Sequence, residues 1–241
     1  MEKAWNAVNG MYKTIKFPGV WKPSLFMYFS LALSISTYEG RFYWYTDPKA
    51  SPAFSQEFVG MIYAIGALAS IVGSLIYQKC LKNFPFRNQL FIAQLLYVTT
   101  GMLDLIFVLR CNLKLGISDY LFVVMEECVS RIITKIRLTP MIVLSTKLCP
   151  SGIEGSFFAL LMCIDSLGSL SSKWAGGMAL HALHVTRTDF RNLWFAILIR
   201  NALRLATVSF IFLSPTADSS DVLIPPNLLS NSSTNLDVEE E

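Results

Sequence analysis

The stretch "LFVVMEECVSRIITKIRLTPMIVL", residues 121–144, is apolar enough and long enough to be a membrane-spanning helix, yet it carries five charges. About 20 mostly apolar residues are needed to cross a bilayer as a helix. The charged residues in this run are Glu126, Glu127, Arg131, Lys135 and Arg137. Each charge costs about 2.5–3.5 kcal/mol at the centre of a membrane helix on insertion scales. We therefore expect these side chains to face protein or a watery cavity rather than lipid.

The spacing of these charges places them on defined sides of the helix. Glu127, Arg131 and Lys135 follow one another at i, i+4 intervals and form a ladder along one side. Glu126 and Arg137 are eleven positions apart, close to three full turns, and share a second face. The charged surface thus occupies a large part of the helix circumference.

Composition indicates the class of protein. Of 241 residues, 53% are hydrophobic and 15% charged, with a mean hydropathy of +0.47, whereas soluble domains carry about 25% charge. This composition predicts a multi-span, all-α membrane protein. The net charge of +3 and the scattered basic residues argue against nucleic acid as a partner. Phosphate-binding, metal-binding and nucleophile motifs are missing, so we expect no enzyme activity, no cofactor and no metal.

Six spans are predicted with the criterion of about 20 apolar residues. They are 23–39, 58–77, 88–109, 120–147, 153–183 and 190–213. The fourth and fifth exceed a straight crossing, so tilt or a break is expected, with Pro140 as a cause of a break in the fourth. Residues 1–22 are interpreted as a basic cytoplasmic segment and 214–241 as a disordered acidic tail. No signal or transit peptide is evident at the N-terminus.

Further carboxylates fall in or beside other predicted spans: Glu39, Asp104 and Asp165. One interpretation is a polar central cavity that binds a charged solute, with a carboxylate that can take up a proton. The alternative is a set of ion pairs that only hold helices together, namely Glu127 with Arg131 and Asp165 with Lys173.

Five blocks of sequence, in order along the chain, resemble one family. They are "VWKPSLFMYFSLALSISTYEGRFYW", "GSLIYQKCLKNFPFR", "LGISDYLFVVMEE", "LCPSGIEGSFFALLMCIDSLG" and "VTRTDFRNLW". Together they resemble the folate-biopterin transporter family of the major facilitator superfamily, over about residues 5–213. That resemblance implies a fold of twelve spans in two six-helix halves, of which this chain is similar to the second.

The resemblance implies transport of folate or pterin by a secondary active mechanism, here with one half of the fold. Proton coupling is a further hypothesis. The working unit would include the bilayer and either a second six-helix half or a second copy of the chain. The alternative is a non-transporting half that assembles with or regulates a full-length membrane partner. The family implies the plastid envelope or the plasma membrane as its location.

Roles for the charged residues follow from this implied solute. A pterin ring presents adjacent N–H donors that a carboxylate accepts in pairs, and the carboxylates of a folate tail suit basic side chains. The candidate solute-binding residues are Glu126, Glu127, Arg131, Lys135, Asp104 and Glu39. The candidate proton-coupling residues are Asp165 and Glu127.

Overall fold

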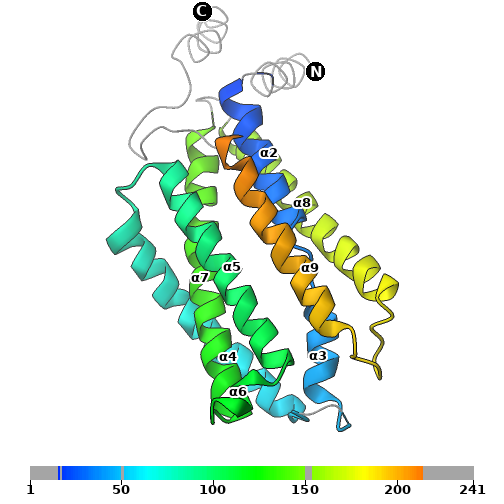
Figure 1. Ribbon diagram of the computed structural model, residues 1–241. Coiled ribbons are helices and arrows are strands. Elements are labelled where there is room, and N and C mark those ends of the chain that lie inside the picture. Colours follow the sequence, from blue (N-terminus) through cyan, green and yellow to red (C-terminus); the bar gives the residue numbers. More distant parts are fainter. Residues whose placement is uncertain (1–15, 17, 50–51, 150–153, 214–241) are drawn as a thin grey trace, which may run out of the picture.

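The computed structural model describes residues 16, 18–49, 52–149 and 154–213, and within these ranges the regular structure is all helical (Figure 1). The long helices are α2 (Pro18–Ala32), α4 (Gln56–Ile76), α5 (Phe86–Val108), α7 (Asp119–Lys147), α8 (Glu154–Ala182) and α9 (Leu193–Ala206). The shorter ones are α3 (Tyr38–Thr46) and α6 (Cys111–Lys114), with a π-helical turn η1 (Tyr77–Leu81) and a 3-10 helix η2 (Thr207–Leu213). The tail expected at 214–241 and most of the basic segment lie outside the described residues.

The first predicted span is two helices rather than one. Helix α2 begins at Pro18, five residues before the expected start, because a proline in the first turn lacks only an N–H that has no intrahelical partner there. It ends at Ala32, and α3 starts at Tyr38 after a non-helical link. The single helix expected over 23–39 is therefore wrong, and the break brings backbone polar groups into the bundle.

Helix α8 satisfies the backbone of this break. The Ser172 hydroxyl donates to the carbonyl oxygen of Ser34 over 2.5 Å, and the N–H of Ser36 donates to the carbonyl of Ser172 over 3.1 Å. Gly176 permits this close approach, since a Cβ there would lie 2.0 Å from the Ser36 carbonyl oxygen. Non-helical backbone at membrane depth is tolerated only where protein or water supplies such partners.

Four helical stretches among the described residues are long and apolar enough to cross a membrane on their own. They are Gln56–Leu81, Phe86–Val108, Gly155–Ala182 and Leu193–Leu213. Helix α7 is longer than all but α8, yet its charges set it apart from these four. It runs without interruption through Pro140, so the break expected there is absent.

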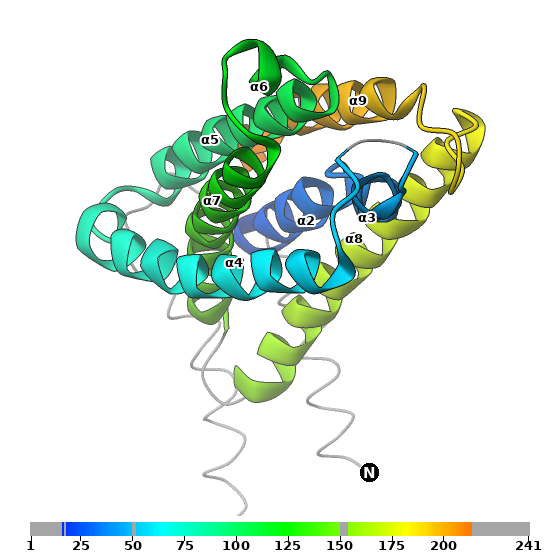
Figure 2. The same ribbon diagram turned by 90° about the horizontal axis from the view of Figure 1, so that it is seen from below.

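The helices form a bundle in which neighbouring helices pack in pairs. Helix α4 packs along α7, and α2 packs along α8, while α5 contacts both α7 and α9. Viewed from below, α4 and α8 lie toward one side of the bundle and α5 and α9 toward the other, with α7 and α2 between them (Figure 2). This arrangement leaves α7 and the α2–α3 break flanked by α4 and α8.

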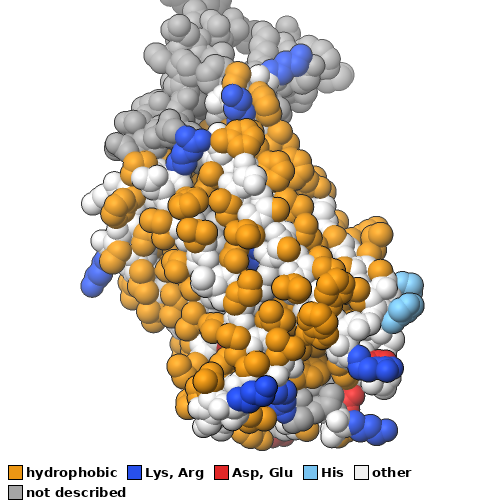
Figure 3. Space-filling model, in the orientation of Figure 1, with side chains coloured by type: hydrophobic (Ala, Val, Ile, Leu, Met, Phe, Trp, Pro, Cys, Tyr) orange, Lys and Arg blue, Asp and Glu red, His pale blue; other side chains and the backbone are white. Residues whose placement is uncertain are grey.

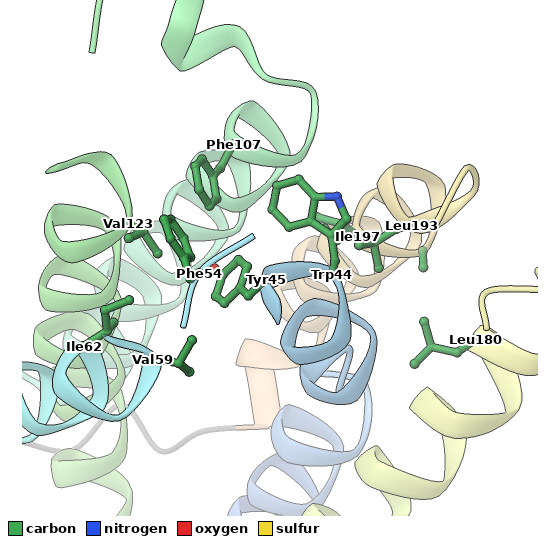
Figure 4. Close-up of a cluster of buried hydrophobic side chains, with 11 residues drawn as sticks. Trp44, Tyr45, Phe54, Val59, Ile62, Phe107, Val123, Leu180, Leu193 and Ile197 are labelled. Carbon is green, nitrogen blue, oxygen red and sulfur yellow. The ribbon is translucent and has the colours of Figure 1, made fainter. Parts of the chain in front are cut away.

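Apolar clusters close the two ends of the bundle. At the end that holds α3, the buried rings of Trp44, Tyr45, Phe54 and Phe107 pack with aliphatic side chains from α4, α7, α8 and α9 (Figure 4). Toward the other end lie two smaller clusters, one around Phe86 and Leu144 and one around Phe26 and Met141. The polar side chains described next lie between these clusters.

The outer surface suits a lipid environment. On the face shown in Figure 3, hydrophobic side chains cover most of the middle, and lysine and arginine side chains gather mainly toward the ends. Large apolar residues such as Leu68, Trp174 and Met178 are strongly exposed. An apolar belt between charged ends is the arrangement expected of a helical membrane protein.

Candidate functional site

A polar cavity of about 320 Å³ lies in the middle of the bundle. Its walls come from the α2–α3 break and from α3, α4, α5, α7, α8 and α9. Six cationic side chains and two carboxylates line it: Arg41, Arg131, Arg137, Lys173, Arg200, Arg204, Asp104 and Glu127. The lining therefore carries an excess of positive charge.

Asp104 on α5 is the centre of one charged group. Its two carboxylate oxygens accept from Arg41 of α3 and from Arg200 of α9, the latter over 2.5 Å. Arg200 also donates to the Thr37 hydroxyl at the start of α3 over 2.8 Å. This network joins three helices around one buried carboxylate, so Asp104 has a strong structural role.

Glu127 and Arg131 on α7 form a second group. The Arg131 Nε lies 2.6 Å from Glu127 Oε1 across one helical turn, as the i, i+4 spacing predicts. Gly66 of α4 faces this pair, since a Cβ there would lie 3.0 Å from the Glu127 side chain. The glycine allows α4 to approach the charged side of α7 closely.

The third group consists of two arginines and a tyrosine. The guanidinium carbons of Arg137 and Arg204 lie 4.2 and 3.9 Å from the centre of the Tyr97 ring. Arg137 also donates to the carbonyl oxygen of Ser30 over 2.9 Å, and Arg204 donates to the Tyr97 hydroxyl over 2.9 Å. Cation–π stacking of this kind orients a guanidinium and leaves part of its edge available for other contacts.

The predicted site residues separate into two sets. Asp104, Glu127 and Arg131 line the cavity together. Four others are outside its lining: Glu126, Lys135, Glu39 and Asp165. Lys135 and Glu39 are exposed.

The two remaining carboxylates are enclosed within the bundle to different degrees. Glu126 is buried, with Oε1 lying 3.7 Å from an Arg41 nitrogen, and neither oxygen accepts a hydrogen bond from a described residue. Asp165 is half-buried, and its Oδ1 has no hydrogen-bond partner among the described residues. The predicted Asp165–Lys173 ion pair is not among those in the described part of the chain, whereas the Glu127–Arg131 pair is present.

Several cavity residues had not been singled out as site candidates. Arg41 falls beyond the predicted end of the first span at residue 39, whereas α3 extends to Thr46. Arg200 and Arg204 stand four residues apart in the apolar run 190–213, and this is the same signal that drew attention to Glu127 and Arg131. Applying that criterion to every span would have found them.

The cavity opens on one side of the bundle. Its exposed lining residues are Tyr38 of α3, Arg131 of α7, and Ser169 and Lys173 of α8. No cluster of three or more potential metal ligands occurs among the described residues, including around His181 and His184.

The fold and site define a multi-pass helical membrane protein with a charged cavity between its helices. The chain belongs to the BT1 family, whose model matches residues 1–224. It is 66% identical over 223 residues to "Probable folate-biopterin transporter 6" of Arabidopsis thaliana, covering 92% of this chain and 44% of that protein. It is 48% identical over 240 residues to "Probable folate-biopterin transporter 2" of the same organism, covering all of this chain and 48% of that protein.

A more distant relative is "Probable folate-biopterin transporter 8, chloroplastic" of Arabidopsis thaliana, 31% identical over 160 residues, or 66% of this chain and 30% of that protein. The chain thus spans about half or less of the length of these relatives. The names of the relatives describe transporters, not enzymes. No solved structure gives a significant match.

Proposed function

We propose that this chain forms one half of a secondary transporter that carries folates or related pterins across a membrane. The observation that carries the proposal is the mid-bundle cavity lined by charges of both signs, in a chain that belongs to the BT1 family. Charged side chains within membrane helices are costly and typically mark a solute or ion path. The names of the relatives specify the solute class.

The cavity offers complementary groups for the two ends of such a solute. Asp104 already accepts from two arginines, so Glu127 is the more available carboxylate for the paired N–H donors of a pterin ring. Arg131 lies beside Glu127 and is partly exposed to the cavity, where it suits an acidic group. Lys135, Glu126 and Glu39 remain proposed contributors in conformations that bring them closer to the solute.

Proton coupling is part of the proposal. Asp165 is the better-placed proton acceptor, because its half-buried carboxyl has an oxygen without a hydrogen-bond partner among the described residues. Glu127, the other candidate, pairs with Arg131 over 2.6 Å and would first have to be released from that arginine.

The proposed architecture is a six-span half of the major facilitator superfamily fold. Counting the α2–α3 pair and α7 as spans, along with the four apolar stretches, gives the six. A second six-helix half, or a second copy of the chain, would cover the open side next to Tyr38, Arg131 and Lys173 and shield these polar groups from lipid. Alternating access would then rock the halves around the cavity.

The membrane is proposed to be the plastid envelope or the plasma membrane. The name of one relative includes the word "chloroplastic", which supports the first location for that protein and suggests it for this chain. Imaging of a tagged chain in plant cells, with envelope and plasma-membrane markers, distinguishes the two.

Uptake of radiolabelled folate into lipid vesicles that contain the purified chain tests the proposed function. We expect uptake that is abolished in Glu127→Gln and retained in Glu57→Gln, since Glu57 is an exposed carboxylate in the first turn of α4. If the wild-type chain gives no uptake but co-purifies with a full-length relative and changes that relative's transport, the non-transporting alternative is supported instead. Equal uptake by both variants contradicts the role of Glu127.

A further inference from the structure

We infer that Arg137 and Arg204 form an anion subsite that binds the tail carboxylates of the solute, so that the cavity favours acid-tailed pterins over uncharged ones. This inference rests on the proposed function and deepens it by specifying the substrate class. It also assigns a binding role to two residues that had not been among the predicted site residues.

The first observation concerns the counter-ions of these two cations. Arg137 is 3% exposed and Arg204 is 8% exposed, yet neither has a carboxylate within ion-pair distance among the described residues. Asp165 interacts electrostatically with Arg137 but lies beyond that distance. By contrast, Asp104 forms ion pairs with both Arg41 and Arg200, and Glu127 forms one with Arg131. A buried unpaired charge is unfavourable, so an anion from outside the chain would gain strong binding here.

The second observation is that groups other than carboxylates hold both guanidiniums in place at the cavity wall. Tyr97 supplies its ring to both, its hydroxyl to Arg204, and a further hydrogen bond to the Ser34 hydroxyl. Ser30 fixes Arg137 through its carbonyl oxygen. The Nε of Arg137 is buried and has no hydrogen-bond partner in the part of the chain that the structure describes. The pair is therefore positioned before a ligand arrives, which lowers the entropy lost on binding.

The chemistry of the ligand follows from that of the site. A guanidinium binds a carboxylate through two parallel hydrogen bonds, a geometry that Arg provides and Lys does not. Folates carry a glutamate tail with two carboxylates, which matches two arginines, whereas biopterin has an uncharged dihydroxypropyl side chain. With Glu127 proposed for the pterin ring, the cavity wall offers a carboxylate for that ring and two arginines for the tail.

The test is equilibrium binding of three probes to the full chain in lipid nanodiscs. The probes are folic acid, p-aminobenzoylglutamate (the tail without the pterin) and biopterin (the pterin without the tail). The variants are Arg137→Gln and Arg204→Gln, with Arg137→Lys as the conservative change. Arg191→Gln is the control, because this arginine lies in a loop with 87% of its side chain exposed.

We expect each glutamine variant to weaken binding of folic acid and of the tail probe by about tenfold to a hundredfold, the range for a charge-assisted hydrogen-bond pair. Biopterin binding and the Arg191→Gln control should be unchanged, and Arg137→Lys should recover part of the loss. Retained biopterin binding also shows that a variant is folded. Equal loss of all three probes, or no loss of the two acidic ones, overturns the inference, whereas the proposed function stands as long as the wild-type chain binds folic acid. If the wild-type chain binds none of the probes, the proposed function fails and the inference with it.

Discussion

Replacement of Asp104 by Asn should destabilise the bundle more than any other single charge removal. Asp104 is 5% exposed and accepts from both Arg41 and Arg200, which come from helices on either side of it. The substitution keeps the shape of the side chain but removes the negative charge that both guanidiniums require. Two arginines are then left buried next to a neutral amide.

Removing one partner of a buried ion pair costs about 3–5 kcal/mol, because the remaining charge is uncompensated. That is a large part of the roughly 5–15 kcal/mol by which a folded domain is stable. On the scale of about 2–4 °C per kcal/mol for a domain of this size, the melting temperature should fall by about 6–20 °C.

Thermal unfolding in detergent, followed by circular dichroism, measures this effect. Asp189→Asn is the matched control, because Asp189 pairs with Arg191 in an exposed loop, and its loss should leave the melting temperature unchanged. The double variant Asp104→Asn with Arg200→Gln should lose less stability than the sum of the two single variants, since one unpaired charge is removed with its partner. An Asp104→Asn variant that melts with the wild type would refute the assignment of Asp104 as the structural centre of the network.

Two further predictions concern helix packing and a surface pair. Gly73→Ala should destabilise the α4–α7 contact, because its Cβ would lie 2.7 Å from the Ile132 carbonyl oxygen. Gly60→Ala is the control: its Cβ meets nothing within 4 Å, and the alanine should stabilise α4 by about 1 kcal/mol through its higher helix propensity. Melting temperatures of the two variants that shift in the same direction contradict this prediction. Hydrogen bonds from Arg191 lower the pKa of Asp189 to about 2. The pair therefore stabilises the folded state at pH values above the ordinary pKa of an aspartate, and this stabilisation is lost as the pH falls through about 2. Carboxyl NMR should show the titration of Asp189 moving toward the ordinary value of about 3.9 in Arg191→Gln, and no movement would exclude the pairing in solution.

The sequence pattern predicted most of the helices because a helix that crosses a bilayer needs a long run of apolar residues, which is visible in the sequence. Predicted and observed bounds of the helix that carries the charge ladder differ by one residue, 120–147 against Asp119–Lys147. The break after α2 could not be predicted, since it depends on hydrogen bonds to Ser172 and on the room left by Gly176, both far along the chain. Local sequence carries no record of such distant partners.

Helical periodicity predicts which side of α7 carries the charges Glu127, Arg131 and Lys135, but it does not predict which of them line the cavity. Each i, i+4 step turns the side chain by about 40°, so Lys135 is displaced by about 80° from Glu127. Glu127 and Arg131 line the cavity, whereas Lys135 is exposed, with its Cβ beside Gly73 of α4. Periodicity identified the charged side of α7, but only the neighbouring helices decide where along that side the cavity ends.

Mutation of Asp104 and mutation of Arg137 should change the melting temperature in opposite directions, and this difference separates a structural role from a binding role. Asp104 is the shared ion-pair partner of two arginines, whereas Arg137 is a buried cation without a carboxylate partner among the described residues. Replacing an unpaired buried charge with an apolar residue of similar volume removes the desolvation cost of that charge. Arg137→Met should therefore melt at or above the wild-type temperature without ligand, even with the loss of its bond to Ser30.

In the wild type, folic acid at a hundred times its dissociation constant should add about 2.7 kcal/mol to the free energy of unfolding. The variant should lose most of that gain, and a fall in its ligand-free melting temperature as large as that of Asp104→Asn would show that Arg137 is structural.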